Sequence, residues 1–221
     1  MKQLQFFEKQ TLSGEKPKKL IIFLHGYGSS GEDLIGLASD FRVTLPDAHF
    51  VSPNAPFEFN HPFMSAIGGY EWFSLDNYDP RIIYPQILEA NEILDKFIKE
   101  QLERFNLDYS DLAVVGFSQG SMMGMYNSLR KKEQNSGILA YSGRLVLPTT
   151  LGEKINSKPK ICLIHGKQDE VLPFDNFIEA QKLLSKENIP FEPHALDDLG
   201  HFIDARGIRI GREFLKTITN H

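Results

Sequence analysis

A serine flanked by glycines lies where an apolar run ends and a helix-forming segment begins. The run Leu112 to Phe117 leads into Ser118, with Gly116 before it and Gly120 after it. A sharp strand-to-helix turn presents such a serine hydroxyl at the edge of a sheet, and side chains at the flanking positions would clash. The alternative is a glycine-rich helix entry with a capping serine. The pattern G-x-S-x-G alone does not separate these two interpretations.

Partners for a reactive serine follow further along the chain. A serine hydroxyl becomes a good nucleophile when an imidazole takes its proton, and a carboxylate must hold that imidazole in the right tautomer. Asp169 in HGKQDEVLP and His201 in DDLGHFID each follow a separate apolar run. We therefore predict a triad of Ser118, Asp169 and His201. The same turn places the backbone N–H of Gln119 at a helix N-terminus, where it can face a developing oxyanion.

Several acidic residues compete with Asp169, namely Glu170, Asp197, Asp198 and Asp204. Asp169 is preferred because it closely follows a strand-like run, so that a short loop can carry it to the edge of the sheet. Asp197 and Asp198 are close to His201 in the sequence, so one of them is an alternative partner for that imidazole.

His201 is preferred among the histidines because it follows Gly200 in a loop after the last apolar run, although a plain surface histidine is the alternative. The other histidines are His25, His49, His61, His165, His194 and His221. Of these, His25 and His165 precede glycines at strand ends and are expected to shape turns. No histidine pair has convincing metal-ligand spacing, so we predict no metal and no cofactor. Cys162 is expected in the core.

The elements that must position these residues alternate between short apolar runs and amphipathic stretches. The runs are Leu20–Gly26, His49–Pro56, Leu112–Phe117, Ile138–Gly143, Ile161–Gly166 and, more weakly, Phe191–Leu196. Helices are predicted from Asp79-Pro80 onward and over 119–132, 174–186 and 207–218. This alternation predicts an α/β fold, a mostly parallel sheet with helices on both faces, in a single domain over residues 1–221. Ligands of such sheets bind beyond the carboxyl ends of the strands.

Composition narrows the function classes. The chain has 221 residues, 41% of them hydrophobic, and a net charge of -5 with no basic cluster, which argues against a nucleic-acid partner. The N-terminus lacks the apolar region of a signal peptide, and no apolar run has the length of a membrane span. The single cysteine excludes an intrachain disulfide and favours a cytoplasmic location, with a disulfide-free secreted protein as the alternative.

The segments LHGYG, SPNAP, EWF, GFSQG, YSGRL, HGKQDEVLP and LGH, in this order, together resemble the acyl-protein thioesterase and lysophospholipase-like carboxylesterases of the α/β-hydrolase superfamily. The resemblance runs from about Leu20 to Phe214. It implies an α/β-hydrolase fold without a large cap, and hydrolysis of carboxylic esters or thioesters through an acyl-enzyme. It also implies that the backbone N–H of Tyr27 is a second oxyanion donor, and that Glu71 to Phe73 lie beside the acyl cleft.

Three positions depart from what the resemblance leads us to expect, and these departures weaken any transfer of substrate specificity. Tyr27 stands where many relatives carry leucine, and its ring could reshape the mouth of the cleft. Ser121 stands where a smaller residue is common, and packing is its expected role. Arg144 follows YSG, where it could line the cleft or belong to the plain surface.

The loop over residues 57–78 is rich in aromatic and apolar side chains. We expect Met64, Tyr70, Trp72 and Phe73 to contribute to the substrate cleft. The loop is either an apolar flap over an acyl chain, able to touch a membrane surface transiently, or a satellite core. The substrate could be a small ester, a thioester, a lysophospholipid or an acylated protein. The oligomeric state stays open, a homodimer included. The rival functions are a non-catalytic binding protein of the same fold and another hydrolase of that fold, such as a dienelactone hydrolase.

Overall fold

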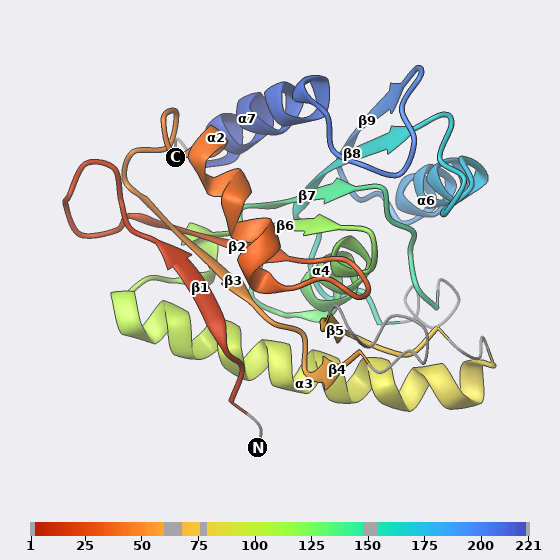
Figure 1. Cartoon of the computed structure of the whole chain (residues 1–221), viewed down its shortest axis with the longest axis horizontal. Helices are drawn as coiled ribbons and strands as arrows, with labels where there is room; N and C mark the ends of the chain where they lie inside the picture. Colours follow the sequence, from red (N-terminus) through yellow and green to blue (C-terminus); the bar gives the residue numbers. More distant parts are fainter. Residues whose placement is uncertain (1–2, 60–67, 76–78, 148–153, 220–221) are drawn as a thin grey trace.

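A seven-stranded sheet in the order β1-β3-β2-β6-β7-β8-β9 forms the centre of the molecule (Figure 1). The structure, a computed structural model, describes residues 3–59, 68–75, 79–147 and 154–219. β1 runs antiparallel to β3, and the other neighbouring strands are parallel. The strands are β1 (Phe6–Lys9), β2 (Lys19–Leu24), β3 (Ala48–Pro53), β6 (Leu112–Phe117), β7 (Gly137–Tyr141), β8 (Lys160–Gly166) and β9 (Phe191–Leu196).

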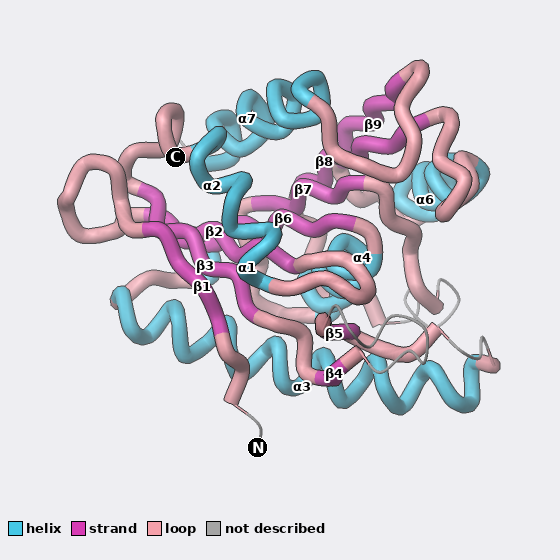
Figure 2. Tube along the Cα trace, in the orientation of Figure 1, coloured by secondary structure: helices cyan, strands magenta, loops and turns pink. Residues whose placement is uncertain are grey.

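Helices cover both faces of this sheet, as the apolar runs of its inner strands require (Figures 1 and 2). One face carries α3 (Pro80–Phe105), α4 (Gln119–Arg130) and α6 (Asp175–Lys186). The other carries α1 (Gly31–Leu34), η1 (Ile35–Leu37), α2 (Ala38–Phe41) and α7 (Ala205–Thr219). A short 3-10 turn, η2 (Tyr109–Asp111), precedes β6. Two hydrophobic cores result, and the sheet separates them.

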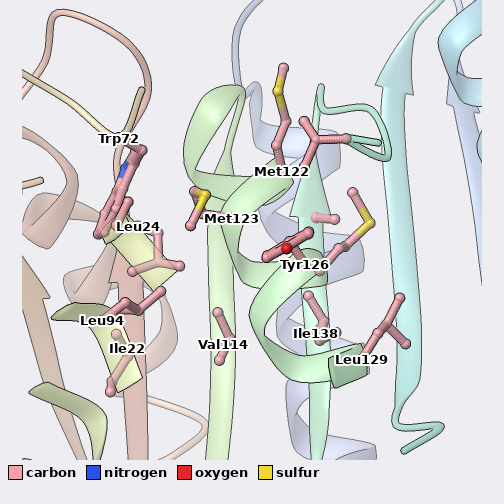
Figure 3. Packing of buried hydrophobic residues seen from close by; sticks show 14 of the residues in the cluster. Ile22, Leu24, Trp72, Leu94, Val114, Met122, Met123, Tyr126, Leu129 and Ile138 are labelled. Carbon is pink, nitrogen blue, oxygen red and sulfur yellow. The ribbon is translucent and has the colours of Figure 1, made fainter. Parts of the chain in front are cut away.

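The core beneath α4 explains the methionines that follow Ser118. Met122, Met123 and Met125 are buried in the same cluster as Leu24 and Trp72, as Figure 3 shows for most of them. Flexible methionine side chains fill irregular gaps between a helix and a sheet. The expectation that these residues serve packing is confirmed.

The predicted helices and strands are confirmed in kind, with bounds that differ by a few residues. The expected N-cap is present, since the Asp79 carboxylate accepts from the backbone N–H of Arg81 at 2.9 Å. Pro193 is accommodated because β9 lies at an edge of the sheet. Three features were not predicted: β1, the short helices α1 and α2, and a small sheet of β4 (Phe57–Glu58) with β5 (Tyr70–Glu71).

Candidate active site

Ser118 occupies a strained turn between β6 and α4. Its backbone has φ 52° and ψ −119°, a conformation that L-residues rarely adopt. Its N–H donates to the Tyr141 carbonyl at 2.9 Å, which ties the turn to β7. A β-carbon at Gly116 would lie 2.4 Å from the Cα of Ser121, and one at Gly120 would lie 1.9 Å from the Leu24 carbonyl oxygen. The two glycines therefore provide the clearance that the sequence predicted.

A chain of hydrogen bonds joins the three predicted side chains. His201 Nε2 lies 2.9 Å from Ser118 Oγ, and His201 Nδ1 lies 2.7 Å from Asp169 Oδ2. The other carboxylate oxygen of Asp169 accepts from the backbone N–H groups of Val171 and Leu172, at 3.0 and 2.8 Å. Because the carboxylate can only accept, Nδ1 of a neutral His201 carries the proton and Nε2 is free to accept from the serine.

The Asp169 carboxylate is fully buried, and a second histidine lies beside it. His165 Nε2 lies 3.4 Å from Asp169 Oδ2 and donates to the Leu172 carbonyl at 2.9 Å. Burial lowers the pKa of His165, which favours its neutral form. His201 is therefore the close partner of the carboxylate, while His165 supports the loop that carries Asp169.

The alternative acids near His201 have other partners. Asp197 pairs with Lys167 at 2.7 Å, and Asp198 accepts from the side-chain amide of Gln168 at 3.1 Å. Asp204 accepts from the backbone N–H of Gly207 at 2.9 Å at the start of α7. The structure therefore places Asp169, and none of these three, against the imidazole.

The predicted oxyanion donors lie on two loops that meet at Ser118. Gln119 begins α4, and the first N–H groups of a helix have no partner within it. The loop after β2 comes close from the other side, since a β-carbon at Gly26 would lie 3.4 Å from Ser118 Cβ. Tyr27 follows in this loop, and its ring packs edge-on against Phe59 at 4.8 Å between centroids. Both donors thus belong to segments at the carboxyl ends of adjacent strands.

The predicted cleft residues differ in burial. Met64 lies outside the described residues. Tyr70 is partly buried, whereas the side chains of Trp72 and Phe73 are fully buried. Trp72 and Phe73 belong to the same core cluster as Leu24, and Phe57 and Tyr70 pack against it, so the described part of the 57–78 loop is part of the main core rather than a satellite core. The burial of Trp72 indicates a role behind the site rather than on its open surface.

A mostly apolar cavity of about 270 Å³ lies next to Phe73. Its walls come from α3, α6 and the segment after β7, and include Ile83, Ile87, Leu145 and Ala180. Arg144, the unusual charge after YSG, lines the same cavity. Phe73 joins the cavity to the serine turn, because its carbonyl accepts from the Gln119 side-chain amide at 2.6 Å.

Two side chains have contacts that the sequence did not reveal. Ser121 is buried, and its hydroxyl donates to the Ser118 carbonyl at 3.1 Å, so the residue supports the turn as well as packing behind it. His25 is buried with Nδ1 at 2.7 Å from the Gly26 carbonyl, while its Nε2 accepts from the Ala55 N–H at 2.9 Å. The HG pair was the available signal for His25, and the expectation of a turn-shaping role is confirmed.

One group of possible metal ligands occurs within the described ranges, away from the triad. Donor atoms of Cys162, Glu192 and His194 lie within 4.8 Å of one another. The Glu192 carboxylate is already paired with the Lys160 ammonium. Burial also raises the pKa of the Cys162 thiol, so the thiol stays protonated. We therefore interpret this group as a Lys160–Glu192 ion pair beside a buried thiol.

Fold and site together define the class of protein. A mostly parallel sheet with helices on both faces, a serine at a strained strand-to-helix turn and an Asp–His pair from later strand ends are the features of an α/β-hydrolase. Within the described residues, no inserted cap domain covers the carboxyl ends of the strands. No described helix is long and apolar enough to cross a bilayer.

Comparison with known proteins identifies the family. A family model described as phospholipase/carboxylesterase matches residues 10–219, so the chain belongs to that family and is a hydrolase. The crystal structure of esterase PE8 is 37% identical, covers 97% of this chain and 99% of its own, and superposes with a TM-score of 0.89. Esterase YpfH of Escherichia coli K12 is 27% identical over 95% of this chain and 88% of its own. Acyl-protein thioesterase 1 of Saccharomyces cerevisiae is 28% identical over 84% and 92%.

Proposed function

We propose that the protein cleaves acyl esters and thioesters with Ser118 as nucleophile, His201 as general base and acid, and Asp169 as the partner of that histidine. The observation that carries this proposal is the continuous hydrogen-bond chain from Ser118 Oγ through the imidazole to Asp169. A general base must lie within hydrogen-bond reach of the proton that it takes, as His201 Nε2 does, while Asp169 stays ionised and holds the imidazole.

The first half of the reaction transfers the acyl group to the enzyme. His201 Nε2 takes the Ser118 proton as Oγ attacks the substrate carbonyl carbon, and the carbonyl oxygen gains the negative charge. The N–H groups of Tyr27 and Gln119 donate to that oxygen. When the tetrahedral intermediate collapses, the bond to the alcohol or thiol breaks, and the leaving group takes the proton from His201.

The second half returns the enzyme to its starting state. Water attacks the acyl carbon of the ester on Ser118, and His201 takes one proton from that water. The bond between the acyl carbon and Ser118 Oγ then breaks, and the serine recovers its proton from the imidazole. The products are the free carboxylic acid and the unchanged enzyme. No metal ion or cofactor is needed to balance either half.

The substrate class that we propose has an apolar acyl group. The cavity beside Phe73 has mostly apolar walls, and Phe73 contacts Gln119 of the serine turn. Pockets of this kind bury ligands through apolar contact, with few polar groups to fix their orientation. The names of the relatives, esterase and acyl-protein thioesterase, support a substrate with an ester or thioester bond. We also propose a cytoplasmic location, because the chain has a single, buried cysteine.

A fluorophosphonate probe tests the nucleophile directly. We expect the wild type to be labelled on Ser118, as mapped by peptide mass spectrometry, and Ser118→Ala to remain unlabelled. Nitrophenyl esters and acyl-thioester substrates of increasing chain length should be hydrolysed by the wild type only. A wild type that is neither labelled nor active would favour the non-catalytic binding protein instead. Labelling that persists in Ser118→Ala would place the nucleophile elsewhere.

A further inference from the structure

The segment Tyr70–Phe73, called the strap below, connects the two loops that carry the proposed oxyanion donors. On one side it is hydrogen-bonded to the loop after β2. The Gly28 N–H donates to the Tyr70 carbonyl at 3.0 Å, and the Tyr70 N–H donates to the Ser29 carbonyl at 2.8 Å. These bonds form an isolated antiparallel bridge, so the loop that contains Tyr27 is held as if it were a third strand beside β4 and β5.

Trp72 extends this connection to both loops at once. Its indole Nε1–H donates to the His25 carbonyl at 3.0 Å, and its backbone N–H donates to Gln119 Oε1 at 2.8 Å. The next carbonyl, that of Phe73, accepts from Gln119 Nε2 at 2.6 Å. The Gln119 side-chain amide is thus held at both its oxygen and its nitrogen by one short piece of backbone. Trp72 is fully buried, so these bonds form away from competing water.

The direction of the Tyr27 N–H follows from the carbonyl on the other side of its peptide bond. In a trans peptide the C=O and N–H point in opposite directions, so fixing the Gly26 carbonyl fixes the Tyr27 N–H. That carbonyl accepts from His25 Nδ1–H at 2.7 Å and from the Ser29 N–H at 3.3 Å. The imidazole must carry its proton on Nδ1, because Nε2 accepts from the Ala55 N–H. The peptide before it, with the His25 carbonyl, is held by Trp72.

We propose that Trp72 is a positioning residue: through the strap it sets the separation and direction of the Tyr27 and Gln119 N–H groups that receive the oxyanion. The proposal rests on the proposed function, since it assigns a role within the same site. Trp72 itself touches no reacting atom. It keeps the two donor loops, which follow different strands, in one fixed arrangement before the substrate binds. Donors that are already in place stabilise the charge that develops in the transition state without having to reorganise.

A positioning role predicts a specific kinetic pattern. Donors that are correctly placed only for the tetrahedral intermediate stabilise the transition state more than the bound substrate. Loosening them should therefore lower kcat while KM stays near its wild-type value. Loss of a whole oxyanion donor costs on the order of 10² to 10³ in kcat, so misalignment of two intact donors should cost less, about tenfold.

The test uses Trp72→Phe and an alkyl trifluoromethyl ketone. The substitution keeps a ring in the core and removes the N–H that donates to His25. The ketone forms a hemiketal with the serine, and its oxyanion occupies the place of the intermediate's oxyanion. We expect kcat for a nitrophenyl ester to fall about tenfold and the inhibition constant of the ketone to rise by the same factor. KM and the melting temperature in the absence of inhibitor are measured on the same preparations.

A second variant keeps the test decisive if Trp72→Phe folds poorly. In Gln119→Glu the new carboxyl can both accept from the Trp72 N–H and donate to the Phe73 carbonyl, but only while it is protonated. When ionised, it faces a carbonyl that it repels. The ratio of the variant's kcat to that of the wild type should therefore rise as the pH falls. A ratio that stays constant with pH would contradict the positioning role.

Leu129→Ala is the matched control. Leu129 is equally buried in the same core but lies at the far end of α4 from Ser118. It should lose stability, as any core truncation does, and keep the wild-type kcat and ketone affinity. The positioning role is overturned if the Trp72 and Gln119 variants keep kcat and the inhibition constant within twofold of the wild type, or if Leu129→Ala shows the same losses. A wild type that does not bind the ketone through Ser118 would instead remove the proposed function, and this inference with it.

Discussion

Polar side chains at the two ends of the parallel strands differ in how far they are buried. At the carboxyl ends, polar side chains are buried, among them His25, Asn54, Ser118, Ser142 and Asp169. Two of these residues, Ser118 and Ser142, also have positive φ angles, 52° and 46°. At the amino ends, charged side chains form pairs that stay accessible to water, such as Lys18 with Asp47 and Lys160 with Glu192.

This difference shows that the features that destabilise the fold, buried polar groups and strained backbone, lie at the carboxyl ends, beside the site. A buried polar group must find hydrogen-bond partners or destabilise the chain, and a strained backbone persists only if its surroundings hold it. At the carboxyl ends such groups find partners on another loop, as His25 Nε2 does in the Ala55 N–H of the loop after β3. Exposed pairs at the amino ends, such as Lys18 with Asp47, need no such network, because water solvates their charges. We therefore expect substitutions at the carboxyl ends to have much larger effects.

The largest expected effect is on activity, from Asp169→Asn. An asparagine has nearly the same shape but can hold His201 in the wrong tautomer, so we expect kcat to fall by about 10⁴-fold. Steady-state hydrolysis of a nitrophenyl ester measures this. The matched control is Asp197→Asn, since Asp197 is nearer to His201 in sequence but pairs with Lys167. Equal losses in the two variants would move the role of the acid away from Asp169.

A large loss of stability is expected from Gly120→Ala. The added β-carbon would lie 1.9 Å from the Leu24 carbonyl oxygen, so the turn and β2 must move apart. Such overpacking against rigid backbone should lower the free energy of unfolding by about 3 kcal/mol. Urea denaturation gives the value. Gly36→Ala is the control, because a β-carbon there meets nothing within 4 Å and should be tolerated. A wild-type stability for Gly120→Ala would contradict the steric account of the elbow.

The sequence predicted the local part of this site well and its supporting network poorly. GFSQG carries the turn, the strand and the helix in one continuous segment, and strand ends led to Asp169 and His201 because parallel strands bring their carboxyl ends together. The strap could not be predicted in the same way. Its strands, β4 and β5, are two residues long and have no readable periodicity.

Contacts with residues far away in the sequence also limit what can be predicted at other positions. The sequence indicates a role for the Gln119 backbone N–H, but the Gln119 side chain is held by residues 46 and 47 positions away. Trp72 was expected to line a cleft because it is aromatic and lies in a loop, whereas the structure buries it completely. Its two hydrogen bonds depend on which loops meet at the sheet edge, which is information that only the fold contains. β1 is not predicted for the same reason, since its four residues alone do not indicate that it pairs with β3.

The pH dependence of stability should also come from the carboxyl ends. Burial lowers the pKa of His25 to about 4 from the ordinary 6.5. Between these two pH values the unfolded chain therefore binds a proton on His25 that the folded chain does not bind. The contribution of neutral, buried His25 to the free energy of unfolding is therefore fully present above pH 6.5. As the pH falls toward 4, the free energy of unfolding decreases by about 3 kcal/mol.

Urea denaturation at a series of pH values checks this against His25→Asn, whose amide can still donate toward the Gly26 carbonyl. The variant is less stable at neutral pH, and the gap between the two proteins should close as the pH falls. Parallel curves for wild type and variant would show that another group dominates the response to acid.

The smallest effect is expected at the opposite ends of the strands, from Lys18→Met. The Lys18 ammonium lies 2.7 Å from Asp47, but its side chain is 73% exposed, so water and salt screen the pair. Asp47 raises the pKa of Lys18, yet at such exposure the pair should leave the urea midpoint unchanged at neutral pH. Added salt should likewise not separate the variant from the wild type. A destabilisation as large as that of His25→Asn would erase the contrast between the two ends, because it would show that a solvated pair can hold the sheet as firmly as a buried network.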